Sequence, residues 1–102
     1  MIHAEMKNIS GEPLNSRVGR TGSQRRLAVV GMVVEDRRES GAQVRKILDA
    51  YSHLILLRNG VPCGKDDVGV VSVIVYADAG ELGSLTGKLS QIQDVRVRSV
   101  TL

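Results

Sequence analysis

Two cationic side chains lie next to glycines and could bind an anion. Arg58 comes two residues before Gly60, and Lys88 directly follows Gly87. Glycine lets the backbone approach a ligand closely, so that backbone N–H groups and a fixed positive charge can together form an anion site. Each cation also has a simpler role open to it, because Arg58 can pair with a carboxylate and Lys88 can cover apolar surface with its stem. Ligand binding by Arg58, Gly60, Gly87 and Lys88 is therefore a hypothesis with a structural alternative.

The residues give little support for a phosphate-binding loop, a metal site or catalysis. Residues 83–89 (GSLTGKL) do not form a phosphate-binding loop, because Leu82 and Leu89 stand where that motif needs glycine and Ser or Thr. His53 and Cys63 are the only His and Cys between residues 27 and 102, which is too few for a zinc site within one chain. Neither a Ser-His-Asp arrangement nor an activated nucleophile is evident. We expect no enzymatic activity, no cofactor and no metal.

Composition and charge indicate a flexible N-terminal tail followed by one folded domain. The chain has 102 residues, and residues 1–26 carry five basic against two acidic side chains, whereas residues 27–102 carry nine of each. The first segment is rich in Gly, Asn and Ser and has no apolar periodicity, so we expect a flexible basic tail over 1–26 and a domain over 27–102. A single cysteine favours a reducing, cytoplasmic location. No apolar run is long enough to cross a membrane.

The pattern of apolar residues predicts the element order β-α-β-β-α-β. Strands are expected at 27–34, 54–57, 68–77 and from 95 to the C-terminus, and helices after Ser40 and over 82–92. This order is typical of the α+β class, as a ferredoxin-like sandwich with a four-stranded antiparallel sheet and two helices on one face. Gly83 and Gly87 lower the propensity of the second helix, which indicates close packing or a surface that faces a ligand.

The first and third strands are apolar at both odd and even positions, although the helices can cover only one face of the sheet. Large exposed apolar patches are rare on monomers, so we expect a second copy of the chain to cover the open face, giving a dimer or tetramer. The residues assigned to this homo-oligomer interface are Val30, Val71, Val73 and Val75.

Several segments resemble a known family. They are residues 33–37 (VVEDR), 55–62 (ILLRNGVP) and 83–89 (GSLTGKL), followed by 95–97 (VRV), and they are similar to the small regulators associated with the iron-only hydrogenase system. The resemblance covers Leu27 to Leu102. It implies an ACT-like fold related to the regulatory half of nickel-responsive repressors, oligomerisation, and the sensing of a small ligand. It also implies that Asp36 and Arg37, between the first strand and the first helix, meet that ligand.

Nickel-controlled DNA binding is not expected of this chain. It lacks the several histidines by which those repressors hold nickel, and its 26-residue tail is too short and too poor in apolar residues for a ribbon-helix-helix unit. Aromatic residues make up only 2% of the chain, which disfavours binding of nucleic acid by base stacking.

The hypothesis is a non-enzymatic, oligomeric regulatory protein that senses a small ligand, with an anion as the candidate, and belongs with the iron-only hydrogenase system. Two alternatives stay open. One is a ligand-free assembly module that acts through a protein partner. The other is a nucleic-acid-associated regulator that uses the basic tail, whose binding would depend strongly on salt.

Overall fold

The structure is a computed structural model that describes residues 24–63 and 67–102. Nearly all of the predicted basic tail lies outside these residues. The elements, in chain order, are β1 (Arg26–Val34), α1 (Ser40–Ala50), the short 3-10 helix η2 (Ser52–Leu54), β2 (Ile55–Pro62), β3 (Gly69–Ala77), α2 (Ala79–Ser90) and β4 (Val95–Thr101). The predicted βαββαβ order and the ferredoxin-like sandwich are confirmed.

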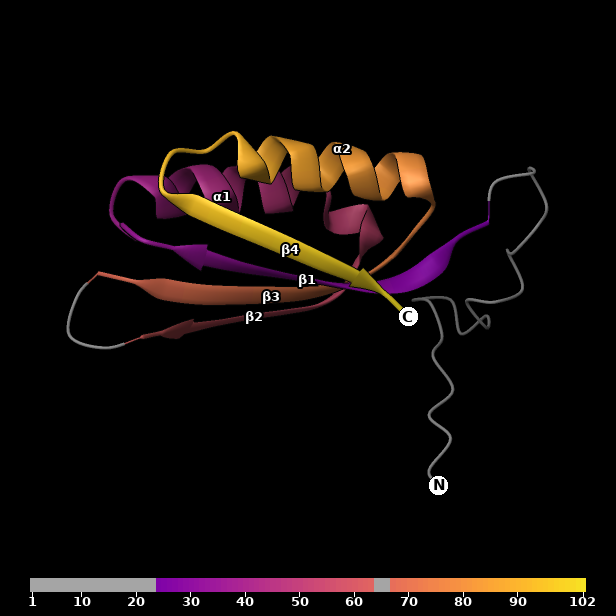
Figure 1. The fold of residues 1–102 in the computed structure, drawn as a ribbon, viewed down its shortest axis with the longest axis horizontal. Helices are drawn as coiled ribbons and strands as arrows, with labels where there is room; N and C mark the ends of the chain where they lie inside the picture. The colour runs from indigo at the N-terminus through magenta and orange to yellow at the C-terminus, as the bar shows by residue number, and fades with distance from the viewer. Residues whose placement is uncertain (1–23, 64–66) are drawn as a thin grey trace, which may run out of the picture.

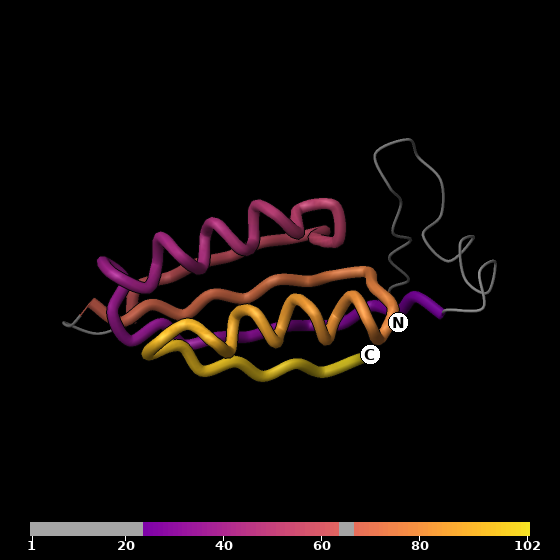
Figure 2. Tube along the Cα trace, turned by 90° about the horizontal axis from the view of Figure 1, so that it is seen from above, coloured from indigo at the N-terminus to yellow at the C-terminus, as the bar shows by residue number. Residues whose placement is uncertain are grey.

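The four strands form one antiparallel sheet in the order β2-β3-β1-β4, and both helices lie on one face of it (Figure 1). Seen from above, α1 runs along the β2 side of the sheet and α2 lies over β1 and beside β4 (Figure 2). The two crossovers place β1 and β3 in the centre and leave β2 and β4 as edges. This arrangement puts α1 above the half of the sheet that is formed by the edge strand β2 and its neighbour β3.

Local sequence explains where the helices begin. α2 starts with a capping box, in which the Asp78 carboxylate accepts from the Glu81 backbone N–H at 2.8 Å and the Glu81 carboxylate from the Asp78 N–H at 3.0 Å. α1 has no side-chain cap at Glu39. Ser40 is the first helical residue, and its hydroxyl donates to the Gln93 carbonyl oxygen at 2.8 Å. This bond joins the start of α1 to the connection between α2 and β4.

The core lies between the sheet and the helices. Its buried residues are Ala28, Val30, Met32, Val34, Val44, Leu48, Leu54, Val73, Val75, Ala77, Leu85, Leu89, Ile92 and Val95. Every second residue of β1 belongs to it, as expected where one face of a strand is packed and the other is not.

The strand register corrects the predicted interface. Val30 pairs with Val73, and both are at most 1% exposed beneath the helices, as is Val75. Val71 is half-buried and packs against the same core. These four valines are on the helix-covered face, so their assignment to an open face is wrong. Side chains alternate between the two faces along a strand, so an error of one residue in the predicted register assigns every side chain to the opposite face.

The other face of the sheet has no helix over it, and we call it the uncovered face. Its apolar residues follow from the register: Val29 pairs with Ile74 and Val100, Ile74 with Leu57, and Val70 with both Val33 and Val61. Three of them are markedly exposed: Leu57 (52%), Val61 (56%) and Val100 (60%). The sheet therefore does have an open apolar face, and it is formed by the residues that alternate along the strands with the four valines of the predicted interface.

Candidate functional site

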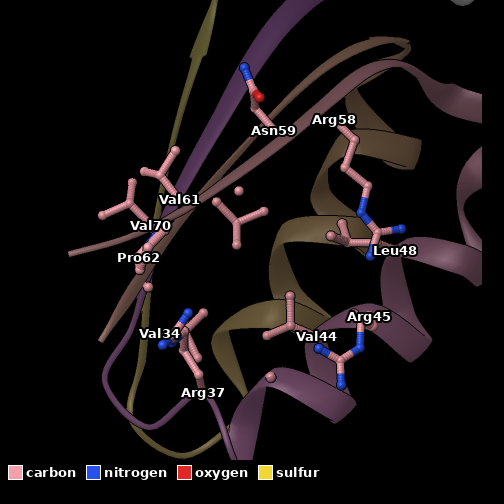
Figure 3. A pocket seen from close by; sticks show the side chains of 14 residues that line it. Val34, Arg37, Val44, Arg45, Leu48, Arg58, Asn59, Val61, Pro62 and Val70 are labelled. Atoms are coloured by element: carbon pink, nitrogen blue, oxygen red, sulfur yellow. The ribbon is translucent and has the colours of Figure 1, made fainter. Parts of the chain in front are cut away.

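A cleft with a volume of about 250 Å³ opens between α1 and the β2–β3 strand pair (Figure 3). Three arginines line it, and we call it the arginine cleft. Arg37 comes from the connection between β1 and α1, Arg45 from α1, and Arg58 from β2. The remaining lining residues are small or apolar, apart from Asn59: Val34, Gly41, Val44, Leu48, Asn59, Gly60, Val61, Pro62, Gly69, Val70 and Val71.

Arg37 is positioned by the start of β3. Its backbone N–H donates to the Asp67 carbonyl oxygen at 2.7 Å. A Cβ atom at Gly69 would lie 2.8 Å from Arg37 Cδ and 3.0 Å from Cγ, closer than carbon atoms can pack. The absence of a side chain at Gly69 therefore makes room for the Arg37 stem against the backbone of β3.

Asp36 has a structural task beside the cleft. Its carboxylate accepts from the backbone N–H groups of Arg38 at 3.0 Å and Glu39 at 3.5 Å, and its carbonyl oxygen accepts from the Ser40 N–H at 2.9 Å. These bonds shape the turn that leads into α1. Asp36 does not line the cleft. Of the two residues that the family resemblance pointed to, the structure brings only Arg37 to the cleft.

Arg58 points toward α1 because it pairs with Val73, whose side chain is on the helix-covered face. Its guanidinium donates to the Asp49 carboxylate of α1 at 2.9 Å. Asp49 is the only acid that the structure shows pairing with a cleft arginine in residues 24–63 and 67–102. Across the same residues, Arg37 and Arg45 form no ion pair. Among the described residues, the cleft therefore carries more positive charge than its ion pairs neutralise.

The apolar part of the lining is continuous with the core. Val34, Val44 and Leu48 are at most 2% exposed, and Val71 packs against them from β3. None of the described residues that line the cleft is acidic. Charged guanidinium groups beside a dry apolar surface suit a ligand that has both an anionic group and an apolar body.

The second predicted cation–glycine pair lies elsewhere. Gly87 and Lys88 are on α2, and the Lys88 ammonium is 5.3 Å from the centre of the Tyr51 ring. Tyr51 and Ser84 share a hydrogen bond of 2.6 Å between their hydroxyls. This bond and the neighbouring Lys88 lower the pKa of Tyr51 below its usual value of 10.0. Arg58 and Lys88 thus do not form one site.

The small-residue surface of α2 is open within the chain. A Cβ atom added at Gly83 or Gly87 would meet no atom within 4 Å. The close packing inferred from these glycines therefore does not occur among the described residues of a single copy.

Arg45 is the cleft residue that the sequence did not reveal. The helical period places it on the polar side of α1. A signal was nevertheless present, because Arg45 directly follows the buried Val44 and so lies at the border of the buried stripe. Its side chain lies along α1 at the border of the cleft, with one guanidinium nitrogen 3.8 Å from the place that a Cβ atom at Gly41 would take.

The described part of the chain contains no group of three or more His, Cys, Asp and Glu side chains that could hold a metal ion. The exposed Cys63 has no disulfide partner. Neither helix of the described residues is long and apolar enough to span a membrane.

The fold is that of a small ACT-like domain. The family model described as "TM1266-like: Iron-only hydrogenase system regulator, putative" matches residues 26–99, and the chain belongs to this family. The resemblance seen in the sequence is thereby confirmed. No curated protein sequence matches the chain.

Two solved structures are similar to this one. The uncharacterized protein TM1266 from Thermotoga maritima is 37% identical, with a TM-score of 0.74, over 78% of this chain and 99% of that one. The ACT domain from GTP pyrophosphokinase of Chlorobium tepidum is 22% identical, with a TM-score of 0.60, over 76% of this chain and 100% of that domain. The second likeness supports the ACT-like fold alone.

Proposed function

We propose that this chain is a non-enzymatic regulatory protein of the iron-only hydrogenase system that senses a small anion bound in the arginine cleft and works as a homo-oligomer in the cytoplasm. One observation carries the ligand part of this proposal. Three arginines from three separate segments line one cleft, and its other described lining residues are small or apolar apart from Asn59, with no acid among them.

The chemistry of arginine supports an anionic ligand. A guanidinium stays protonated at any physiological pH and offers N–H donors in a fork that matches carboxylate and phosphate oxygens. Hydrogen bonds from a charged guanidinium to an anion are stronger than those between neutral groups. The described lining of the cleft offers binding groups, and no nucleophile or general base is among them.

The uncovered face supports the oligomer. Leu57, Val61 and Val100 leave most of an apolar surface open to solvent. Soluble monomers rarely keep a large contiguous surface of this kind, and symmetric self-association is the usual way to bury it. The occupant that we propose is a second copy of the same face.

Thermal unfolding of the full chain tests the ligand proposal. The panel comprises carboxylates, phosphates, nucleotides, amino acids and divalent metals, with light scattering to follow the mass. A ligand at 100 times its Kd adds about 2.7 kcal/mol, which shifts the Tm of a domain this small by several degrees. We expect an anion to cause this shift, Arg45→Ala to abolish it, and Lys88→Ala, the matched loss of a cation outside the cleft, to leave it intact.

The exposed apolar face also favours a second candidate, a ligand-independent assembly module. In that case no compound of the panel raises the Tm, while light scattering still shows a stable oligomer. The nucleic-acid alternative rests on the basic tail, most of which lies outside the described residues.

A further inference from the structure

One of the three cleft arginines, Arg58, already has an anionic partner, the carboxylate of Asp49. The Asp49 carboxylate lies 2.9 Å from the Arg58 guanidinium, where the carboxylate of a ligand would bind. Both side chains are partly exposed, at 36% for Arg58 and 73% for Asp49. Ion pairs with this exposure contribute at most about 1 kcal/mol, so an incoming anion can displace Asp49 at small cost.

We infer that the ligand is a small organic dianion with a short aliphatic body, and that Asp49 competes with it for Arg58. This inference rests on the proposed function. Arg37 and Arg45 lack ion-pair partners among residues 24–63 and 67–102, and Arg58 is balanced by Asp49. Within these residues the arginine cleft thus has two positive charges without an ion-pair partner, which a doubly charged anion neutralises.

The lining also argues against a zwitterion. An amino acid brings an ammonium group, which needs a carboxylate or several carbonyl oxygens around it when it leaves water. The described lining of the arginine cleft has three cations that repel an ammonium and no acid, and the carboxylate beside it, Asp49, is already paired with Arg58. A neutral alcohol of the same length would leave the guanidinium groups unneutralised.

The size of the cleft limits the apolar body. At about 250 Å³ it is smaller than the pockets that hold drug-sized molecules, which measure roughly 300–1,000 Å³. The apolar surface that the ligand can cover comes from the half-buried Val70 and Val71 and the exposed Pro62, because the other apolar lining residues, Val34, Val44 and Leu48, are at most 2% exposed. A chain of a few methylene groups fits this description better than a nucleotide does.

Isothermal titration calorimetry on the full chain in a low-salt, non-anionic buffer tests the ligand class. The probes share a six-carbon chain and differ in charge: adipate and hexyl phosphate as dianions, hexanoate as a monoanion, and 6-aminohexanoate as a zwitterion. We expect at least one dianion to bind more tightly than hexanoate, and 6-aminohexanoate to bind roughly tenfold more weakly than that dianion or worse. Equal binding of 6-aminohexanoate would overturn the dianion assignment.

Asp49→Asn tests the competition. This variant should bind the dianion roughly two- to fivefold more tightly, because Arg58 is then free before the ligand arrives. Asp94→Asn is the matched control, since it removes the same charge outside the cleft at a positive φ of 63° that asparagine tolerates. Its affinity should equal that of the unsubstituted chain.

The outcomes separate this inference from the proposal on which it rests. If a dianion binds and Arg45→Ala abolishes binding, but Asp49→Asn and Asp94→Asn behave alike, the role of Asp49 is wrong and the anion site stands. If no anion of the series binds, both the dianion inference and the anion-sensing function are overturned. Thermal unfolding of each variant confirms that the compared proteins are folded.

Discussion

The two faces of the central strands are built from the same kind of residue and have different environments. On the helix-covered face, Val30 and Val73 are sealed beneath the helices. On the uncovered face, Val29 and its partner Ile74 are half-exposed, next to the more exposed Val100. β-Branched residues suit either face of a strand, so residue type does not distinguish them. The comparison shows that register, rather than composition, decides which valines form the core.

The helix-covered face is itself divided. Beneath the two helices it is closed, but along β2 and the start of β3 it opens into the arginine cleft, where Gly60 and Gly69 leave space. The described residues thus form an apolar surface that suits another copy of the chain, to which β4 also contributes Arg96 and Arg98, and a recess lined by three arginines that suits a ligand. The recess opens on the helix side of β2 and β3, the apolar surface lies on the other side of the sheet, and Val61 and Val70 border both.

The largest expected effect comes from placing a charge on each face. Val73→Asp buries a carboxylate among apolar side chains and should lower the free energy of unfolding by about 3–5 kcal/mol, measured in urea. Val100→Asp should change unfolding of the monomer by less than about 0.5 kcal/mol and should reduce the oligomer mass in light scattering. A stable Val73→Asp protein with a reduced oligomer mass would instead show that Val73 belongs to the interface between copies of the chain.

Alanine at two strand glycines separates the cleft from the uncovered face. Gly69→Ala should lower stability by about 1–3 kcal/mol and weaken anion binding, because the added Cβ displaces the Arg37 stem. Gly31→Ala is the matched substitution in β1 on the uncovered face, where a Cβ meets no atom within 4 Å, and it should be tolerated. Urea unfolding and calorimetry with adipate measure both effects. Unchanged anion binding in Gly69→Ala would refute the proposed placement of Arg37.

The outer side of α2 is a third surface, to be compared with the uncovered face as a site of assembly. Gly87→Ala should stabilise the protein by about 0.5–1 kcal/mol, since alanine has the higher helix propensity and the added methyl meets nothing. Urea unfolding at two protein concentrations provides the measurement. A loss of stability that depends on concentration would show that this surface of α2, and not the uncovered face alone, takes part in assembly.

The smallest effect concerns Tyr51, between the helices and away from the arginine cleft. Its phenol should deprotonate below pH 10, because the hydrogen bond from Ser84 favours the phenolate, and Lys88 adds to this effect. Ser84→Ala should move the pKa back toward 10.0. Ultraviolet titration detects this change, with Tyr51→Phe identifying the signal against that of Tyr76. An unchanged titration in Ser84→Ala would contradict the bond.

The order of elements could be predicted from the sequence, because each depends on local periodicity. The helix around Val44 and Leu48 and the strand at 68–77 are examples. Arg58, Gly60 and Arg37 were also identified as candidate ligand residues, and they line one cleft. Their common location supports the anion-site hypothesis without testing it.

The features that could not be predicted depend on contacts between distant segments. The faces of Val30 and Val73 follow from the register between β1 and β3. The place of Arg45 depends on the distance between α1 and β2, and the role of Gly69 depends on a side chain from another connection. Local patterns carry no information about such spacing.

Mapping of amide chemical shifts by NMR, with adipate added to the full chain, tests the central claim most directly. If an organic anion binds in the arginine cleft, the shifts should be concentrated in residues 41–48 of α1 and 58–62 of β2, and should vanish in Arg45→Ala. Shifts concentrated around Gly83–Lys88 on α2, or spread over the uncovered face, would contradict the account.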